Sequence, residues 1–141
     1  MIIVLIGYMA SGKTSIGKKL AEKLNYNFLD LDDFIEEKEN MSVTDVFKEK
    51  GEIYFRKQES QYLNRLLKSK NNTILSVGGG TPCYSGNIDV ILSAKTTEEM
   101  TAFIGKHLFE RIQFYNQAEI KVSIDNKTKD DVVEDIILEL F

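Results

Sequence analysis

One motif near the start of the chain constrains its fold more than any other stretch. Residues 7–14 read Gly-Tyr-Met-Ala-Ser-Gly-Lys-Thr, which matches the phosphate-binding loop pattern G-x-x-x-x-G-K-[ST]. The apolar, β-branched run at residues 2–6 is typical of a buried parallel strand. After the loop, apolar residues recur at helical spacing, so a helix is predicted to begin at about Lys13. The motif therefore has the strand and the helix that it requires on either side.

This order of strand, loop and helix predicts a nucleoside-triphosphate site. Backbone N–H groups of the loop and the positive end of the helix both favour phosphate. Lys13 supplies a mobile positive charge for the outer phosphates, and the Thr14 hydroxyl suits Mg²⁺. The residues expected to contact the nucleotide are Gly7, Met9, Ala10, Ser11, Gly12, Lys13, Thr14 and Ser15.

Length and composition narrow the class of protein. The 141 residues fit one domain spanning residues 1–141, and a net charge of −4 argues against a nucleic-acid partner. That charge does not exclude small anionic substrates, which local clusters can hold. The single cysteine, Cys83, rules out an internal disulfide and suits a reducing compartment. Without a signal peptide or a membrane-length apolar run, a cytoplasmic protein with no membrane partner is expected.

Two aspartates follow the next apolar segment. Residues 28–32 read as a short strand whose alternation puts Asp30 and Asp32 on the same side. They would then reach the crevice at the carboxyl ends of the strands, where open α/β sheets bind ligands. The alternative is that Asp32 or Asp33 caps a helix over residues 34–39. Capping would explain Asp33 but not Asp30.

Arg56 is expected on a helix that begins after a break at Gly51. It lies three residues before Glu59, so the two side chains are neighbours on that helix, and a surface ion pair is the ordinary interpretation. The alternative is recognition of a carboxylate, to which the planar guanidinium can donate two parallel hydrogen bonds in a bidentate pair. The scarcity of arginine, which occurs only at 56, 65 and 111, favours that alternative.

Three glycines follow another buried strand at residues 73–77. Gly78, Gly79 and Gly80 cost more conformational entropy than a plain turn needs. They offer backbone without Cβ atoms, against which a ligand can lie. A flexible linker would usually be longer and rich in serine, so ligand contact is favoured.

The C-terminal third reads less clearly. Residues 88–93 suit either a helix or a strand, whereas a capping-box spacing from Thr96 to Glu99 predicts an amphipathic helix that continues to Arg111. Its apolar face would comprise Met100, Phe103, Ile104 and Leu108. Arg111 lies at the far end of this predicted helix. It is either a positive charge that the helix dipole favours at the C-terminus or a side chain directed inward at a functional site. His107 is expected to be a packed or solvated imidazole, not a metal ligand.

A last strand at residues 120–124 and a helix from Thr128 complete the alternation of strands and helices. Alternation of this kind implies a mostly parallel central sheet covered on both faces. The predicted fold class is α/β, with the three-layer αβα architecture of P-loop kinases.

Taken together, these motifs resemble those of the shikimate kinase family. Its members are small P-loop enzymes that transfer the γ-phosphoryl group of ATP to the 3-hydroxyl of shikimate. The resemblance covers nearly the whole chain. It rests on residues 7–14, on Leu29-Asp30-Leu31-Asp32, on Tyr54-Phe55-Arg56, on Ser76-Val77-Gly78-Gly79-Gly80, and on Glu110-Arg111 with Phe114-Tyr115.

The resemblance implies a role for each candidate residue. On the nucleotide side, Thr14 ligates Mg²⁺, Asp30 supports the ion through water, and Lys13 follows the charge on the transferred group. On the acceptor side, Asp32 accepts from the hydroxyls and is the candidate base. Residues 78–80 line the substrate through their backbone. The shikimate carboxylate is clamped by Arg56 and Arg111.

One departure concerns the lid that closes over ATP in the family. The family carries a further helix, strand, helix and lid before the helix of the second arginine, and the lid bears an arginine beside a proline. Here Pro82 is the only proline, and no arginine occurs between Arg65 and Arg111. The nucleotide-side arginine of the C-terminal Asp-x-Asn motif is also absent from Asp125-Asn126-Lys127. Either the sequence as given omits a segment of the protein near residues 94–98, which the intact flanks favour, or the chain is a shortened natural or engineered form.

Three functions follow from this departure. The first is an active shikimate kinase that acts on ATP and shikimate as a monomer. The second is a catalytically weak module that binds the nucleotide and shikimate but cannot close over them. The third is a kinase for another small polyol acid such as gluconate, against which the two-arginine clamp and the triple glycine argue by resemblance.

Overall fold

Strands and helices alternate along the chain, as the sequence predicts. The computed structural model describes residues 1–84, 86–93, 100–104 and 112–141. The predicted lid gap near 94–98, His107 and Arg111 lie outside these residues. The elements in chain order are β1 (Ile2–Ile6), α1 (Lys13–Leu24), β2 (Asn27–Asp30), α2 (Leu31–Glu39), α3 (Val43–Leu67), β3 (Thr73–Ser76), a 3₁₀ turn (Thr81–Cys83), α4 (Asn87–Ser93), β4 (Met100–Ile104), α5 (Ile112–Tyr115), β5 (Ile120–Val122) and α6 (Lys129–Leu140).

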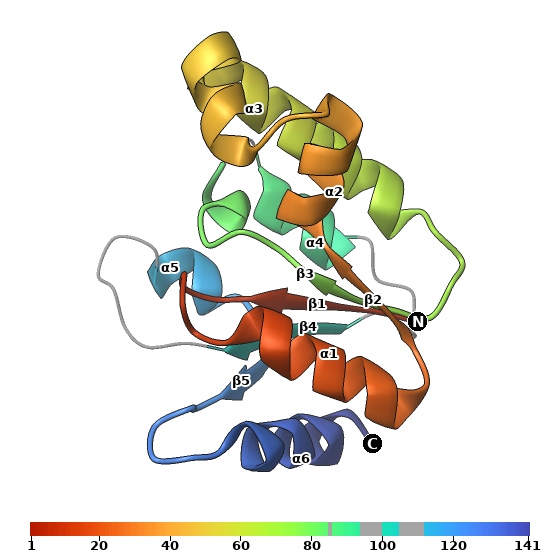
Figure 1. Cartoon of the computed structure of the whole chain (residues 1–141). Coiled ribbons are helices and arrows are strands. Elements are labelled where there is room, and N and C mark those ends of the chain that lie inside the picture. Colours follow the sequence, from red (N-terminus) through yellow and green to blue (C-terminus); the bar gives the residue numbers. More distant parts are fainter. Residues whose placement is uncertain (85, 94–99, 105–111) are drawn as a thin grey trace.

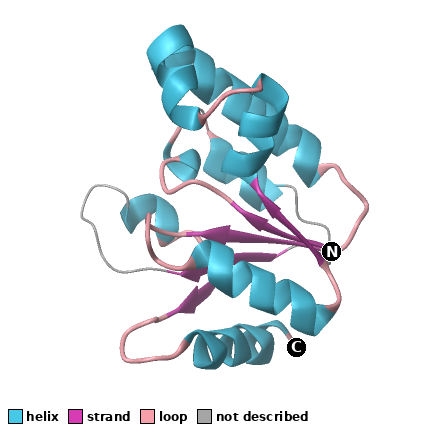
Figure 2. Ribbon diagram, viewed as in Figure 1, coloured by secondary structure: helices cyan, strands magenta, loops and turns pink. Residues whose placement is uncertain are grey.

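The strands form one parallel sheet in the order β2-β3-β1-β4-β5. Helices α1 and α6 lie on one face, and α2, α3 and α4 lie on the other (Figures 1 and 2). Strand β1 is central and buried throughout, with alternate residues facing opposite layers. Val4 packs in the core beneath α2 and α3, whereas Ile3 and Leu5 pack beneath α1 and α6. The predicted three-layer αβα class is confirmed.

Several predicted boundaries hold. The first strand covers residues 2–6 and the first helix begins at Lys13. Gly51 has φ 83° and ψ 168°, so it interrupts the helical geometry of α3 where the break was predicted. Thr128 caps α6 through a capping box with Asp131. Residues 88–93 belong to the helix α4. No helix in the described ranges is long and apolar enough to cross a membrane.

The predicted strand at residues 28–32 is too long. Strand β2 ends at Asp30, which is the N-cap of α2: its Oδ1 accepts a hydrogen bond of 3.0 Å from the backbone N of Asp32. Neither Asp32 nor Asp33 is the cap, because the side chain of Asp30 satisfies the first turn and lets the helix begin at Leu31. Asp32 therefore reaches the site from a helix.

The predicted helix over residues 96–111 is wrong for residues 100–104, which form strand β4. Its backbone pairs with β1 on one side and with β5 on the other. A short apolar run suits either state, and pairing on both edges outweighs the helical spacing. Residues 96–99 and 105–111 lie outside the described part of the chain.

Candidate active site

The loop after β1 surrounds the side chain of Lys13. Gly12 takes the left-handed conformation (φ 88°) at the N-cap of α1, where glycine meets no Cβ strain. Lys13 is only 8% exposed, and its Nζ donates to the backbone oxygens of Gly7 (2.9 Å) and Tyr8 (2.5 Å). Ser11 Oγ also donates to the Tyr8 oxygen, at 2.8 Å. The predicted nucleotide-binding residues 7–15 thus form one continuous loop and helix start.

Burial lowers the pKa of Lys13, while the nearby carboxylates of Asp30 and Asp32 act in the opposite direction. An ammonium held by two backbone oxygens of its own loop is available to a phosphate that replaces those partners. Beside the loop lies a hollow of about 270 Å³, lined by Tyr8, Met9, Ala10, Ser11 and Ile124. Ile124 follows β5, so the hollow lies at the carboxyl end of the sheet.

Thr14 and Asp30 meet directly beside the phosphate loop. Thr14 Oγ1 donates to Asp30 Oδ2 at 3.1 Å, while the other oxygen of Asp30 caps α2. Within the described residues, no group of three or more His, Cys, Asp or Glu could hold a metal ion. Mg²⁺ keeps several waters and takes only one or two protein ligands together with substrate phosphates. A hydroxyl beside a carboxylate fits that ion.

Asp32 lies in the first turn of α2, close to the glycine loop. A Cβ atom added to Gly78 would lie 3.3 Å from Asp32 Oδ1. Burial raises the pKa of Asp32 to about 6, the negative charges of Asp30 and Glu59 add to this effect, and Lys13 opposes it. The carboxylate of Asp32 has a pKa near neutrality and interacts electrostatically with Lys13 of the phosphate loop. Such a group is suited to accept a proton.

Arg56 is held in a partly buried ion pair. Its Nη1 donates to Glu59 Oε2 at 2.9 Å, and its Nε lies 3.5 Å from the exposed carboxylate of Glu52. Glu59 is 1% exposed, so its pairing with Arg56 is not the surface ion pair of the ordinary interpretation. A Cβ atom on Gly80 would lie 3.0 Å from Arg56 Nη2. The guanidinium therefore lies directly against the glycine loop.

Polar side chains that were not predicted from the sequence hold that loop. Glu59 Oε1 accepts from Thr81 Oγ1 at 2.6 Å, and Asn87 Nδ2 donates to the Thr81 backbone oxygen at 2.9 Å. On another side, Tyr115 OH donates to the Gly79 oxygen at 2.6 Å. All four side chains are buried. The Phe114-Tyr115 pair was part of the family resemblance, but no sequence signal connected Thr81 or Asn87 with the site.

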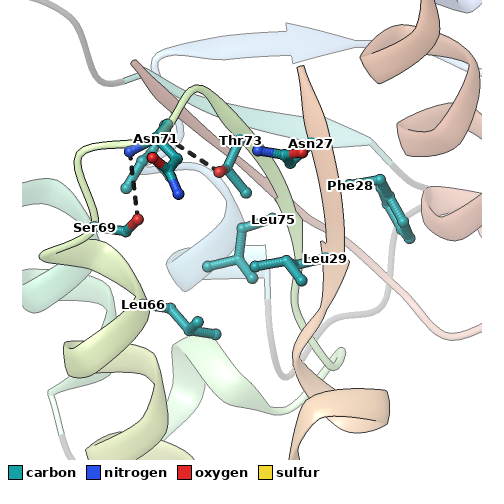
Figure 3. Close-up of a pocket in the computed structure, with 9 residues that line it drawn as sticks. Asn27, Phe28, Leu29, Leu66, Ser69, Asn71, Thr73 and Leu75 are labelled. Atoms are coloured by element: carbon teal, nitrogen blue, oxygen red, sulfur yellow. Dashed lines mark hydrogen bonds between the residues drawn. The ribbon is translucent and has the colours of Figure 1, made fainter. Parts of the chain in front are cut away.

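The fold thus brings together Lys13, Thr14, Asp30 and Asp32, with Arg56 and residues 78–80 close by. Arg111 lies outside the described residues. A different hollow of about 310 Å³ is visible in Figure 3, where Leu29, Leu66 and Leu75 form its apolar wall. Asn27 and Thr73 in its lining begin β2 and β3, so this hollow lies at the opposite end of the strands from the phosphate loop. It is separate from the site.

A parallel sheet with a phosphate loop after its central strand, and a carboxylate near the lysine of that loop, is typical of a P-loop kinase of small molecules. A model of the shikimate kinase family matches residues 9–97. Shikimate kinase from Flavobacterium johnsoniae is 40% identical over 165 aligned positions, which cover 96% of each chain. The chain belongs to the shikimate kinase family, whose members are ATP-dependent kinases.

Solved structures agree with this assignment. The crystal structure of shikimate kinase from Aquifex aeolicus matches with a TM-score of 0.88 and 31% identity, covering 99% of this chain and 96% of that one. Shikimate kinase from Bacteroides thetaiotaomicron matches with a TM-score of 0.87 and 29% identity, covering 99% and 98%. The similarity therefore extends over the phosphate loop as well as over the segments that carry Asp32, Arg56 and the glycine loop.

Proposed function

We propose that this chain transfers the γ-phosphoryl group of ATP to the 3-hydroxyl of shikimate. The observation that carries the proposal is the position of Asp32, which lies against Gly78 of the glycine loop and within electrostatic range of Lys13. This partly buried carboxylate has the pKa, about 6, of a group that takes a proton near neutral pH. Family membership identifies the acceptor class.

On the nucleotide side, residues 7–15 would bind the phosphates of ATP through backbone N–H groups and the start of α1. Lys13 would leave the oxygens of Gly7 and Tyr8 and follow the transferred phosphoryl group. Thr14 and Asp30, already hydrogen-bonded to each other, would hold Mg²⁺, which neutralises phosphate charge when it is bound.

On the acceptor side, Asp32 would orient the attacking hydroxyl and receive its proton. The backbone of residues 78–80 would lie against the sugar-like ring, which can approach closely because no Cβ atom intervenes. Arg56 would bind the carboxylate of shikimate with its planar guanidinium. A second contact from Arg111 rests on the family resemblance, since Arg111 lies outside the described residues.

The test is a coupled assay of ADP release with shikimate, with gluconate, and without an acceptor. Shikimate-dependent release, absent in Lys13→Ala and with gluconate, supports the proposal. Release that gluconate stimulates as well as shikimate does would contradict the acceptor. Binding of both ligands by calorimetry without any ADP release would support the weak binding module instead.

We also infer that this chain lacks the lid segment of its relatives, at a point near residues 94–98. Two observations support the inference: the alignment with the Flavobacterium johnsoniae enzyme needs 165 positions for a chain of 141 residues, and no arginine occurs between Arg65 and Arg111. A positioned arginine contributes roughly 10³–10⁵ to the rate of related phosphoryl transfers. A chain of 16.1 kDa should therefore bind ATP but transfer its phosphoryl group slowly.

Intact mass spectrometry combined with single-turnover kinetics tests this inference. Slow transfer by a 16.1 kDa protein is expected. Fast transfer by that species would show that the lid is dispensable. Fast transfer by a heavier species would show that the functional protein contains the segment after all.

We further propose that the enzyme acts as a cytoplasmic monomer. The sequence holds a single cysteine, Cys83, which suits a reducing compartment. The exposed apolar side chains of the described residues are dispersed over separate elements, from Met9 and Ile53 to Leu138. Light scattering on the protein as it elutes from a size-exclusion column tests the proposed monomeric state. A mass that corresponds to a dimer would overturn it.

A further inference from the structure

An aromatic ring covers the guanidinium that faces the glycine loop. Tyr84 follows the 3₁₀ turn and is 39% exposed. Arg56 Cζ lies 4.0 Å from the centroid of its ring. The rings of Phe55 and Phe47 lie farther from the same atom, at 5.3 and 5.9 Å. Tyr84 is therefore the nearest of the three rings that contact this cation.

The other contacts of Arg56 leave one edge of the guanidinium beside the glycine loop. Glu59 takes Nη1, and the exposed Glu52 lies 3.5 Å from Nε. Both terminal nitrogens lie against Gly80, because a Cβ atom added there would lie 3.0 Å from Nη2 and 3.2 Å from Nη1. Within the described residues no hydrogen bond or ion pair takes Nη2, so that nitrogen remains for a substrate carboxylate.

We propose that Tyr84 is a positioning residue, which holds the Arg56 guanidinium in the orientation that receives the substrate carboxylate. The inference rests on the proposed function. Arginine loses considerable rotamer freedom when it binds a ligand, and a contact that orders it beforehand reduces that cost. The ring supplies cation–π attraction and excludes water from one face of the guanidinium. The arginine is thereby preorganised for the carboxylate.

The main chain of Tyr84 is held by the same polar cluster that holds Arg56. Its backbone oxygen accepts from the Asn87 backbone N at 2.9 Å, and the Asn87 side chain donates to the Thr81 oxygen. Thr81 in turn donates to Glu59, the partner of Arg56. The ring and the cation are therefore positioned by one connected set of hydrogen bonds, which distinguishes Tyr84 from a tyrosine on a free loop.

The contact with Arg56 is made by the ring of Tyr84 and not by its hydroxyl, so the variants must test the ring. Tyr84→Phe keeps the face and Tyr84→Ala removes it. Tyr26→Ala is the control for loss of a tyrosine ring away from the site, because Tyr26 lies in the turn before β2, at the other end of the strands, and packs against the core there. Tyr84 is partly exposed in a turn, so its truncation leaves no core cavity.

The first measurement is NMR of protein labelled with ¹⁵N-arginine, whose three arginines give few signals. Guanidinium protons of Arg56 over a ring face should show a ring-current shift in the native protein and in Tyr84→Phe. That shift should decrease strongly in Tyr84→Ala, where the more distant rings of Phe55 and Phe47 remain, and persist in Tyr26→Ala. A spectrum that Tyr84→Ala leaves unchanged would overturn the contact.

The second measurement is shikimate affinity by calorimetry, with ATP affinity as the internal control. Tyr84→Ala should weaken shikimate binding by about three- to tenfold, and Tyr84→Phe should not. ATP affinity should be the same in all variants. In an Arg56→Met background, Tyr84→Ala should have no further effect, because its partner is gone.

The outcomes separate the two proposals. Loss of the ring-current shift with undiminished shikimate affinity overturns the positioning role of Tyr84 while the proposed function stands. A native protein that shows the shift but binds no shikimate overturns the proposed function, and the ring–guanidinium contact stands. An equal loss in the Arg56→Met background also overturns the inference, since Tyr84 would then act by another route.

Discussion

The nucleotide half and the substrate half of the site are built in different ways. Most of the proposed nucleotide half comes from one continuous stretch, residues 7–15, to which Asp30 is joined by its hydrogen bond with Thr14. The substrate half is assembled from α2, α3, the loop after β3 and α5, and side chains hold it together. A continuous stretch leaves a motif in the sequence, whereas an assembly from four segments does not.

The two halves also differ in where their charges lie. Lys13 is surrounded by oxygens of its own loop, beside an open hollow. In the substrate half, Asp32 and Glu59 are carboxylates placed near each other, and among the described residues only Glu59 has an arginine partner. Changes in the nucleotide half should therefore affect catalysis with little effect on folding, whereas changes in the substrate half should affect both.

The largest effect is expected from Lys13→Ala. Phosphoryl transfer should fall by at least about 10³-fold, because no other positive side chain of the phosphate loop can follow the transferred group. The melting temperature should change little, since the lysine contacts only backbone oxygens of an accessible loop. Single-turnover kinetics and thermal melting measure the two quantities. Lys13→Met, which keeps most of the side-chain volume, controls for packing; normal turnover in both variants would refute the phosphate-loop role.

Asp32→Asn should lower the activity while raising the stability of the fold. Turnover should drop by about 10²–10⁴-fold, since the amide cannot accept the proton. The melting temperature at pH 7 should rise, because the substitution removes a buried charge that Asp30 and Glu59 disfavour. A lower melting temperature at that pH would show that the attraction to Lys13 dominates instead.

The same variant has a pH signature. The folded pKa of Asp32, about 6, exceeds its ordinary value of 3.8, so between these values the folded state binds more protons than the unfolded state. Stability from this group is therefore lost as the pH rises from about 4 to about 6. The difference in melting temperature between Asp32→Asn and the native protein should be absent below pH 4 and complete above pH 7. Turnover of the native protein should rise through pH 6 as Asp32 ionises.

Arg56→Lys should have an intermediate effect, confined to one ligand. Lysine keeps the charge but loses the planar fork, and the loss of one charge-assisted contact costs about 1.5–3 kcal/mol, or roughly ten- to a hundredfold in shikimate affinity. ATP affinity should not change. Arg65→Lys, on the exposed face of the same helix, is the matched control. If calorimetry shows both ligands weakened equally by Arg56→Lys, the arginine is structural.

How far the sequence predicts this molecule follows the same division. The phosphate loop, β1 and α1 could be located because the motif and the apolar spacing on its two sides are local signals. Asp30 was recognised as a site residue but not as the cap of α2, since capping depends on where the strand ends. The strand at 100–104 was missed because local spacing favours a helix there. Its pairing with β1 joins residues that are about a hundred positions apart in the sequence.

The substrate half shows the limit of pattern reading most clearly. The spacing of Arg56 and Glu59 predicts that they are neighbours, but only the fold shows that Glu59 is buried and also bound by Thr81. Three consecutive glycines predict a close approach of some group. That group includes the guanidinium of Arg56 as well as any ligand, which no sequence pattern indicates.

The smallest effect, and the sharpest test of the division into halves, is expected from Tyr115→Phe. Tyr115 touches both: its hydroxyl donates to the Gly79 oxygen at 2.6 Å, and its ring meets the ring of Tyr8 edge to face at 4.9 Å. The substitution removes the hydrogen bond to Gly79, worth about 0.5–1.5 kcal/mol, and keeps the ring contact. The KM for shikimate should therefore rise about two- to tenfold while the KM for ATP stays constant, with Tyr26→Phe as the control. If both KM values rise together, the hydroxyl acts on the two loops as a unit, and the halves are not independent in the way that their construction suggests.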